Sequence, residues 1–193
     1  MDDSPTQASD YLRRKAKELN VEDVAFHVLN HPRFFLWSGS SKPNQHHYGK
    51  HGLIVHTAEV AHLCYINNLV FKSSIDDRWL YLAALFHDCG KMWDYEPLSE
   101  NYETWGSTSH KRQVHHISRS ALIWHEATLN HKVEGLTQSI IDDILHAILA
   151  HHGQRDYGSP VAPNTQLAWM LHLCDGISAR MYDAGQWDGV KDK

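Results

Sequence analysis

The chain has 193 residues, of which 42% are apolar and 21% are charged, so we expect one packed domain and not a disordered chain. Its 18 Lys and Arg and 23 Asp and Glu give a net charge of −5. This argues against a broad nucleic-acid surface but allows a local basic groove or a small phosphorylated substrate. The 17 histidines are the unusual count, because histidine is the commonest metal-binding side chain. The three cysteines form no CxxC pair and are expected to be reduced core residues. With no signal peptide and no apolar run near the ~20 residues of a membrane span, these features predict a cytoplasmic protein that enters no membrane.

Residues 1–41 are predicted to form a short helical extension. Helical periodicity favours helices over residues 8–20 and 21–30, and an apolar stretch at residues 34–37 should pack onto the main body. Residues 38–44 have the composition of a loop. The first helix carries a basic patch, made by Arg13, Arg14, Lys15 and Lys17.

Residues 42–183 are predicted to form the main helical domain. Its first helix carries apolar and polar residues at helical spacing, namely Leu53, His56, Val60, Leu63 and Asn67. This spacing places His56 on the buried stripe of the helix.

The next helix begins at Asp76-Asp77 and ends in the sequence His87-Asp88-Cys89-Gly90-Lys91, where Gly90 should stop it. Residues 93–108 are predicted to be a long loop, of the kind that often covers a functional site. The remaining helices are expected over residues 109–129, over residues 136–152 and from residue 164, before a frayed tail at residues 184–193. No segment alternates with period two, so the predicted fold is an all-α helical bundle.

Polar side chains stand on the apolar faces of five of these helical segments. They are His56, His87 with Asp88, His116, His151 with His152, and Asp175. Alone, each has an ordinary explanation, because a buried histidine is more often a hydrogen-bonded core residue than a ligand. Together, buried polar groups without a common partner would each cost about 1–3 kcal/mol. A shared metal centre removes that cost, so the sequence favours a metal site.

The order of these residues resembles that of the HD-domain metal-dependent phosphohydrolase superfamily, over residues 42–183. The surrounding sequence is most similar to the HD domain of the YhaM-type 3′–5′ exoribonucleases. The segments that carry the similarity are His46-His47-Tyr48, Gly52-Leu53-Ile54-Val55-His56-Thr57, His87-Asp88-Cys89-Gly90-Lys91, His116-Ile117, His151-His152-Gly153, Gly158-Ser159-Pro160 and Leu171-His172 to Asp175. The family often has glycine where this sequence has His51 and His115. Those exoribonucleases also carry an OB-type nucleic-acid domain where this sequence has residues 1–41.

The resemblance implies a fold, a cofactor and a set of ligands. The cofactor would be one or two divalent ions of Mn, Fe, Zn, Co or Mg. The implied ligands of the first ion are His56, His87, Asp88 and Asp175. Asp88 would bridge to a second ion, and the other implied ligands of that ion are His116 and His151. His152 would be either a further ligand or a residue that contacts one, and a bridging water would be the nucleophile.

The resemblance also implies roles for residues around this centre. Lys91 would act with Asp88 in catalysis by neutralising charge on the phosphate; the ordinary alternative is a solvated lysine at a helix end. The residues implied to line the path of the phosphate are His46, His47, Lys42 and Lys50. For the last two, an ordinary polar loop is the alternative. Four other histidines are taken as non-ligands, namely His110, His125, His131 and His146, and His172 is expected to lie near a ligand.

We therefore expect an enzyme that uses metal-activated water to cleave a phosphate ester or phosphodiester. The expected substrate is a nucleotide or a short single-stranded oligonucleotide, and a homo-oligomer is left open. One alternative is a 3′–5′ exonuclease on single-stranded RNA or DNA, with the basic patch of residues 8–20 as its grip. A second alternative is a non-catalytic, nucleotide-binding sensor.

Overall fold

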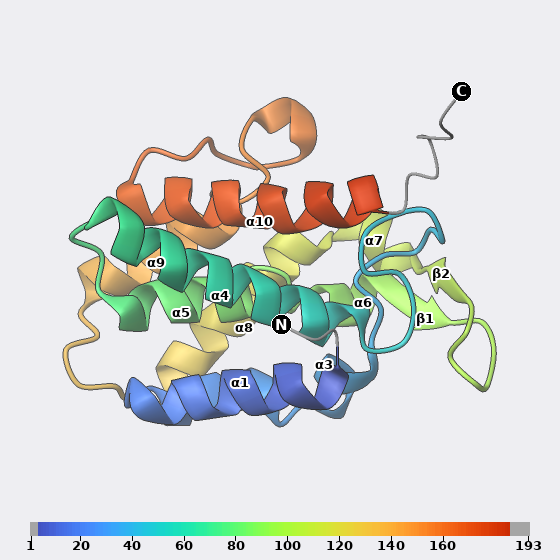
Figure 1. Cartoon of the computed structure of the whole chain (residues 1–193), viewed down its shortest axis with the longest axis horizontal. Coiled ribbons are helices and arrows are strands. Elements are labelled where there is room, and N and C mark those ends of the chain that lie inside the picture. Colours follow the sequence, from blue (N-terminus) through green and yellow to red (C-terminus); the bar gives the residue numbers. More distant parts are fainter. Residues whose placement is uncertain (1–3, 186–193) are drawn as a thin grey trace.

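The computed structural model describes residues 4–185, and the side chains as far as residue 181. Within this part of the chain the regular structure is almost entirely helical (Figure 1), as the sequence predicted. The helices are α1 (Pro5–Glu18), α2 (Glu22–Leu29), α3 (Pro32–Leu36), α4 (Gly52–Phe71), α5 (Asp77–Phe86), α6 (Lys91–Asp94), α7 (Ser109–Gln113), α8 (His116–Asn130), α9 (Gln138–Ala150), the 3-10 helix η1 (Arg155–Tyr157) and α10 (Gln166–Gly185). No described helix has both the length and the apolar character needed to span a bilayer. Of the predicted tail, residues 184 and 185 belong to α10 and residues 186–193 lie outside the described residues.

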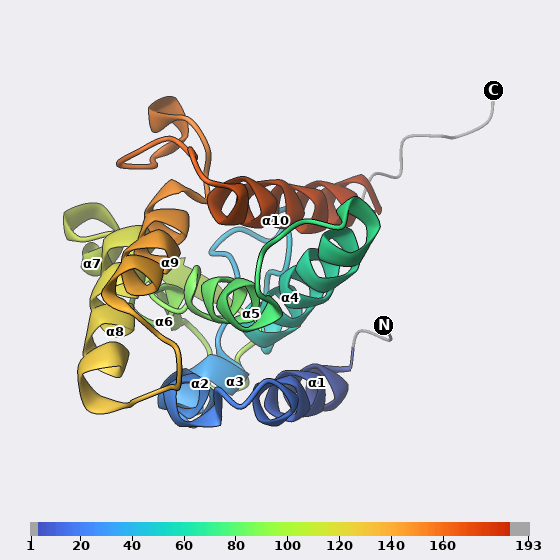
Figure 2. The same cartoon turned by 90° about the vertical axis from the view of Figure 1, so that its left-hand side faces the viewer.

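Helix α5 forms the centre of the bundle. Every residue from Trp79 to Phe86 is buried, because this segment is apolar on all sides and needs other helices around it. It contacts α2, α4, α8, α9 and α10, and Figure 2 shows α10 above it and α1 and α2 below it. The chain that leaves α5 at His87 therefore lies inside the protein.

Helices α1, α2 and α3 share the hydrophobic core of the main bundle. The buried face of α1 consists of Ala8, Tyr11, Leu12 and Ala16, which lie at helical spacing. From α5, the hydroxyl of Tyr81 donates a hydrogen bond of 2.7 Å to the carbonyl oxygen of Leu12. The amino-terminal helices are thus packed directly against the element that leads to the site.

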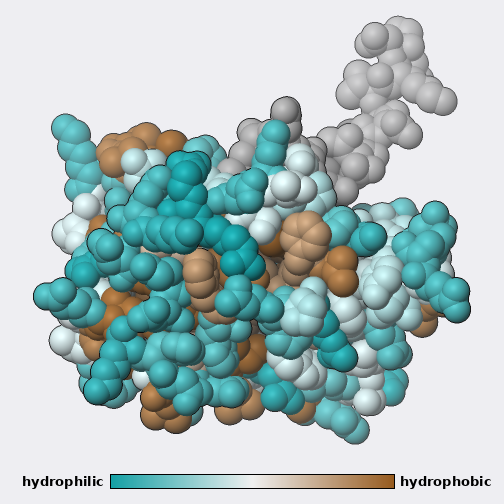
Figure 3. Space-filling view, turned by 90° about the horizontal axis from the view of Figure 1, so that it is seen from below, coloured by the Kyte–Doolittle hydropathy of each residue, from teal (hydrophilic) through white to brown (hydrophobic). Residues whose placement is uncertain are grey.

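Three of the four residues of the basic patch of α1 make contacts within the protein, while Lys17 is exposed. Arg13 donates hydrogen bonds to Asn30 and to the carboxyl-terminal end of α2, while Arg14 and Lys15 both pair with Glu18. The side of the molecule that carries α1 is mainly hydrophilic, with scattered apolar residues (Figure 3). It lies across the bundle from α10 (Figures 1 and 2).

The segment predicted as a long loop, residues 93–108, contains a short hairpin of two antiparallel strands, β1 (Tyr95–Pro97) and β2 (Trp105–Ser107). Strands of three residues are too short to show period-two alternation, so the sequence could not indicate them. The indole of Trp37 donates a hydrogen bond of 2.7 Å to the carbonyl oxygen of Tyr95. This bond holds the hairpin against the bundle.

Among the predicted helix boundaries that differ from the structure, two bear on the site. Gly90 does not end α5 in a left-handed conformation, because its φ is −63° and α5 already ends at Phe86. Instead, a Cβ at Gly90 would lie 2.2 Å from the carbonyl oxygen of His116, so the close approach of α8 requires glycine there. The helix predicted over residues 109–129 is broken between α7 and α8, where His115 has a φ of 68°.

Candidate metal centre

Polar side chains from four helices converge on Asp88, just after α5. His87 precedes it in the chain, and the others come from α4 (His56), the start of α8 (His116), the end of α9 (His151) and α10 (Asp175). All are buried except Asp175, whose side chain is 15% exposed. The structure therefore brings together the residues that the sequence predicted as metal ligands.

One group of ligand atoms surrounds Oδ2 of Asp88. The Nε2 atom of His56 lies 3.3 Å from this oxygen and 3.1 Å from Oδ1 of Asp175. The Nε2 atom of His87 lies 3.4 Å from the same Asp88 oxygen and 3.3 Å from Nε2 of His56. Atoms that bind one ion at about 2.0–2.2 Å are necessarily about 3–4 Å apart, so the four side chains are spaced as ligands of a single ion.

A second group surrounds Oδ1, the other oxygen of Asp88. This oxygen is 3.4 Å from Nε2 of His116 and 3.5 Å from Nε2 of His151. All three atoms are buried and none has a hydrogen-bond partner. Leaving a buried polar atom unpaired costs about 1–3 kcal/mol, and a cation between the three atoms would remove that cost. The ring of His152 offers a further nitrogen within 4.8 Å of those of His116 and His151.

The other ring nitrogens of these histidines are bound to the protein, which turns each Nε2 toward the centre. Nδ1 of His87 donates to the carbonyl oxygen of Ala84 and Nδ1 of His151 to that of Ile148, both at 2.7 Å. His152 makes the same kind of bond, at 3.0 Å, to a carbonyl oxygen of η1. Metal-binding histidines are commonly held in this way, because the outer hydrogen bond selects the tautomer and orients the ring.

Comparison with known families agrees with this geometry. The sequence model of the HD domain matches residues 53–180, a range that contains every residue of both groups. The chain belongs to the HD domain family. HD domains bind divalent metals and are generally metal-dependent hydrolases, and the donor set of this HD domain, with its unpaired buried atoms, fits such ions. The identity of the metal stays a prediction. No solved structure gives a significant match to the chain.

Within the HD domain, Lys91 is buried beside Asp88. It is 6% exposed, and its Nζ lies 2.6 Å from Oδ2 of Asp88. Burial alone would lower the pKa of Lys91, but the nearby Asp88 carboxylate, together with Tyr95 and Asp175, raises that pKa above its ordinary value. Burial likewise works to raise the pKa of Asp88, but Lys91 and the neighbouring histidines hold it well below its ordinary value. The alternative interpretation of Lys91 as a solvated helix-end residue is therefore wrong.

The pKa values of three histidines at the centre are shifted in opposite directions. Burial lowers the pKa of His116 to about 4 and that of His152 to about 2, so both rings are neutral and ready to bind a metal. Burial also disfavours the charged form of His56, but Asp175 and Asp88 raise its pKa to about 9. A cation bound beside His56 would have to displace that proton.

Asp94 is a functional candidate that sequence reasoning missed. It is completely buried, and its Oδ2 accepts hydrogen bonds from the backbone N–H of His116 (2.9 Å) and from Nδ1 of the same residue (3.2 Å). Its Oδ1 accepts a bond of 2.7 Å from Nδ1 of His110, which the sequence classed as a non-ligand. No local signal marks Asp94, because only the packing of α6 against α8 brings it to His116.

Ser178 and Glu59 were also missed, although the sequence carried a signal for them. Nδ1 of His56 donates a hydrogen bond of 3.0 Å to the hydroxyl of Ser178, which donates one of 2.7 Å to Glu59. Glu59 lies three residues after His56 and Ser178 three residues after Asp175. That spacing places each on the same helix face as the ligand before it.

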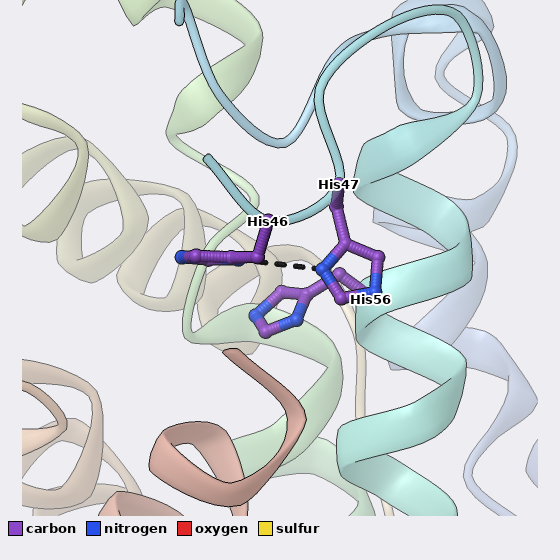
Figure 4. Close-up of side chains that lie close together, drawn as sticks. All are labelled: His46, His47 and His56. Atoms are coloured by element: carbon purple, nitrogen blue, oxygen red, sulfur yellow. Dashed lines mark hydrogen bonds between the residues drawn. The ribbon is translucent and has the colours of Figure 1, made fainter. Parts of the chain in front are cut away.

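A pocket of about 460 Å³ opens onto the centre. Its lining includes the candidate ligands Asp88, His151, His152 and Asp175, together with Lys91. His46, which the sequence predicted to bind substrate, lines it too. Next to this pocket, the rings of His46 and His47 from the loop before α4 lie close to that of His56 (Figure 4).

Three other residues predicted to line the path of the phosphate do not line this pocket. His47 is buried, and its Nε2 lies 2.9 Å from a carboxylate oxygen of Glu59. Lys50 is exposed and its Nζ stands 5.6 Å from the ring centre of Tyr102, while Lys42 is exposed on the same loop. A role for these three in substrate binding stays a prediction. His172, expected near a ligand, donates a hydrogen bond of 2.7 Å to the carbonyl oxygen of His151.

Proposed function

We propose that this HD domain is a hydrolase of phosphate esters or phosphodiesters, acting on a nucleotide or a short single-stranded nucleic acid. The observation that carries the proposal is the Asp88 carboxylate, which directs one oxygen to each of two groups of ligand atoms. A carboxylate shared in this way is suited to hold two divalent ions close together. Such a pair, of Mn, Fe, Zn, Co or Mg, supplies polarisation of a phosphoryl oxygen and a water molecule of lowered pKa.

Each residue then has a defined task. His56, His87 and Asp175, with Oδ2 of Asp88, would hold one ion; His116 and His151, with Oδ1 of Asp88, would hold the other. His152 would be a further ligand or a residue that contacts one.

The charge of Lys91 supports its predicted catalytic role. Its ammonium group is ionised, adjoins Asp88 and lines the pocket. In that position it would balance negative charge on a phosphoryl group that approaches the centre, and burial strengthens the interaction because less water screens it.

The volume of the pocket and the contacts of the basic residues on α1 favour a small substrate. The pocket volume of about 460 Å³ falls in the range of small-molecule sites, about 300–1,000 Å³. The alternative of a nuclease that grips its substrate through α1 gains little support, because three of the four basic residues of α1 have side-chain partners within the protein and only Lys17 has none among the described residues. Close similarity to YhaM-type exoribonucleases stays a prediction.

The test is the substitution Asp88→Asn, which keeps the shape of the side chain but removes the charge that both ion sites share. We expect metal-dependent hydrolysis of bis(p-nitrophenyl) phosphate with Mn²⁺ to fall at least a hundredfold, and bound metal to fall with it. His125→Gln, on the exposed face of α8, is the control and should behave like the wild type. Undiminished turnover by Asp88→Asn would refute the proposal. Nucleotide binding by the wild type without any product would favour the sensor alternative.

A further inference from the structure

The pocket has a wall that the proposed hydrolysis does not use. Arg180 and Tyr157 both line it, yet neither belongs to the metal centre. Arg180 is exposed and makes no ion pair or hydrogen bond with any residue that the structure describes. The ring of Tyr157 is also available, since this residue is 70% exposed.

The surface of α10 connects Arg180 to the metal centre. Asp175 and Arg180 are five positions apart, which corresponds to about 7.5 Å along a helix axis. Between them, Gly176 and Ala179 line the same pocket and present almost no side chain. A Cβ at Gly176 would meet no heavy atom within 4 Å, so packing does not require glycine there. The result is an open groove from the metal ligands to a guanidinium group.

Two further observations connect this groove to the metal centre. Its inner end holds Asp88 and His151, whose Oδ1 and Nε2 atoms are buried and unpaired. The η1 turn that carries Tyr157 is tied to the centre, because the carbonyl oxygen of Tyr157 accepts the hydrogen bond from Nδ1 of His152. The backbone of Tyr157 is therefore held beside the centre, and its ring lines the pocket.

We propose that Arg180 binds a second phosphate of the substrate, one nucleotide away from the phosphate that is hydrolysed, and that Tyr157 stacks on a neighbouring base. This rests on the proposed function and narrows its substrate to the end of a short single strand, in place of a nucleoside monophosphate. A guanidinium group matches phosphate through two parallel hydrogen bonds. Arg180 lines the same pocket as the candidate metal ligands Asp88 and Asp175, so a single ligand in this pocket would contact both. Aromatic rings accept any base by stacking.

The charge of the protein limits the length of this strand. Tight binding of a long single strand requires many cations along a groove, and this chain has a net charge of −5. Among the residues that line the pocket, one is a lysine, Lys91, and one is an arginine, Arg180. Two cations, one at each end of the groove, fit a substrate that presents two phosphates.

The experiment compares three dinucleotides with Mn²⁺: ApA, which has one phosphate, and pApA and ApAp, which have two. In the wild type, kcat/KM for at least one two-phosphate substrate should exceed that for ApA at least tenfold. Arg180→Gln should abolish this preference by raising KM and leave hydrolysis of ApA within about twofold of wild type. The control is Arg112→Gln, because Arg112 is exposed on α7 and does not line the pocket.

A binding measurement gives a readout that does not depend on turnover. With Ca²⁺ in place of Mn²⁺, the affinity for a fluorescein-labelled dinucleotide with two phosphates should fall as the salt concentration rises. The slope of log affinity against log salt should be smaller by about 0.7 in Arg180→Gln, the value for one lost phosphate contact on a single strand. An unchanged slope would overturn the role of Arg180, as would an equal loss of activity on ApA and on the two-phosphate substrates.

The outcomes separate this proposal from the proposed function. If the wild type hydrolyses ApA and bis(p-nitrophenyl) phosphate but shows no preference for a second phosphate, the second phosphate site is refuted and the phosphohydrolase stands. If the wild type hydrolyses none of these compounds with any of the metals, the phosphohydrolase is refuted and the second phosphate site falls with it.

Discussion

Asp94→Asn tests whether the carboxylate behind His116 controls one of the two ion sites. Three N–H groups point at this buried carboxylate, two from His116 and one from His110. An asparagine has the same shape but offers one oxygen and one NH₂ group. If its oxygen serves His116, its NH₂ group faces Nδ1 of His110. His110 cannot relieve this contact by changing tautomer, because its Nε2 accepts a hydrogen bond of 3.1 Å from Arg119.

The magnitude follows from these contacts. One buried donor left without an acceptor should lower the free energy of unfolding by about 1–3 kcal/mol. Loss of the carboxylate that orients a metal-binding histidine typically weakens metal affinity about 10–100-fold, which is about 1.4–2.7 kcal/mol at that site. The other ion site, formed by His56, His87 and Asp175 with Asp88, does not contact Asp94 and should keep its affinity.

The assay is a titration of the purified protein with Mn²⁺ or Zn²⁺ by calorimetry, with competition by a chelator to separate the two sites. Asp142→Asn is the control, because Asp142 is exposed on α9 and its carboxylate contacts Gln138 alone among the described side chains. If Asp94→Asn weakens both sites equally, or lowers stability and leaves both affinities unchanged, the assignment of Asp94 to the His116 site is refuted.

Two further predictions concern stability. Gly90→Ala places a methyl group 2.2 Å from the backbone oxygen of His116. We expect the free energy of unfolding, measured with denaturant, to fall by at least about 1–3 kcal/mol, and metal binding to weaken. An unchanged unfolding midpoint would contradict the close packing of this segment against α8. In the presence of a chelator, the free energy of unfolding should fall as the pH is lowered from 6.5 toward 4. Burial keeps the pKa of His116 in the folded protein at about 4, whereas the unfolded chain takes up this proton near pH 6.5. For this one group the expected slope is about 1.4 kcal/mol per pH unit. His152 has the same sign, with a pKa of about 2, whereas the raised pKa of His56, about 9, adds stability that is complete below 6.5 and is lost as the pH rises toward 9. Urea unfolding at pH 6.5, 5.5 and 4.5 checks the slope, and constant stability across that range would show that these rings are not held neutral.

Much of the bundle could be predicted from local patterns. The apolar spacing around His56 indicated α4, and the acidic pair at Asp76-Asp77 indicated the start of α5, where the Asp76 side chain does accept a hydrogen bond from the backbone N–H of Arg78. Helix periodicity and capping depend on residues a few positions apart, so a single sequence contains them. The hairpin after α6 and the break at His115 depend on distant contacts and were not predicted.

Two histidines at the start of helices have positive φ angles, which residues other than glycine rarely adopt. His51 and His115 stand where the family often has glycine, and both have left-handed φ values, of 69° and 68°. Such angles cost a residue other than glycine about 1–3 kcal/mol. Each of the two begins a helix that carries a candidate ligand, so surrounding packing holds these strained positions in place.

The sequence alone determined which side chains could act as ligands, because histidine and aspartate on apolar helix faces can be recognised from helical spacing. It also determined that the chain is helical, because periodicity is local. Only the tertiary structure decided that the two oxygens of Asp88 face different histidines, that Asp94 stands behind His116, and that Arg180 borders the pocket while Lys50 does not. Those relations join segments far apart in the chain, and they arise when α5 is enclosed by helices whose mutual packing no local pattern encodes.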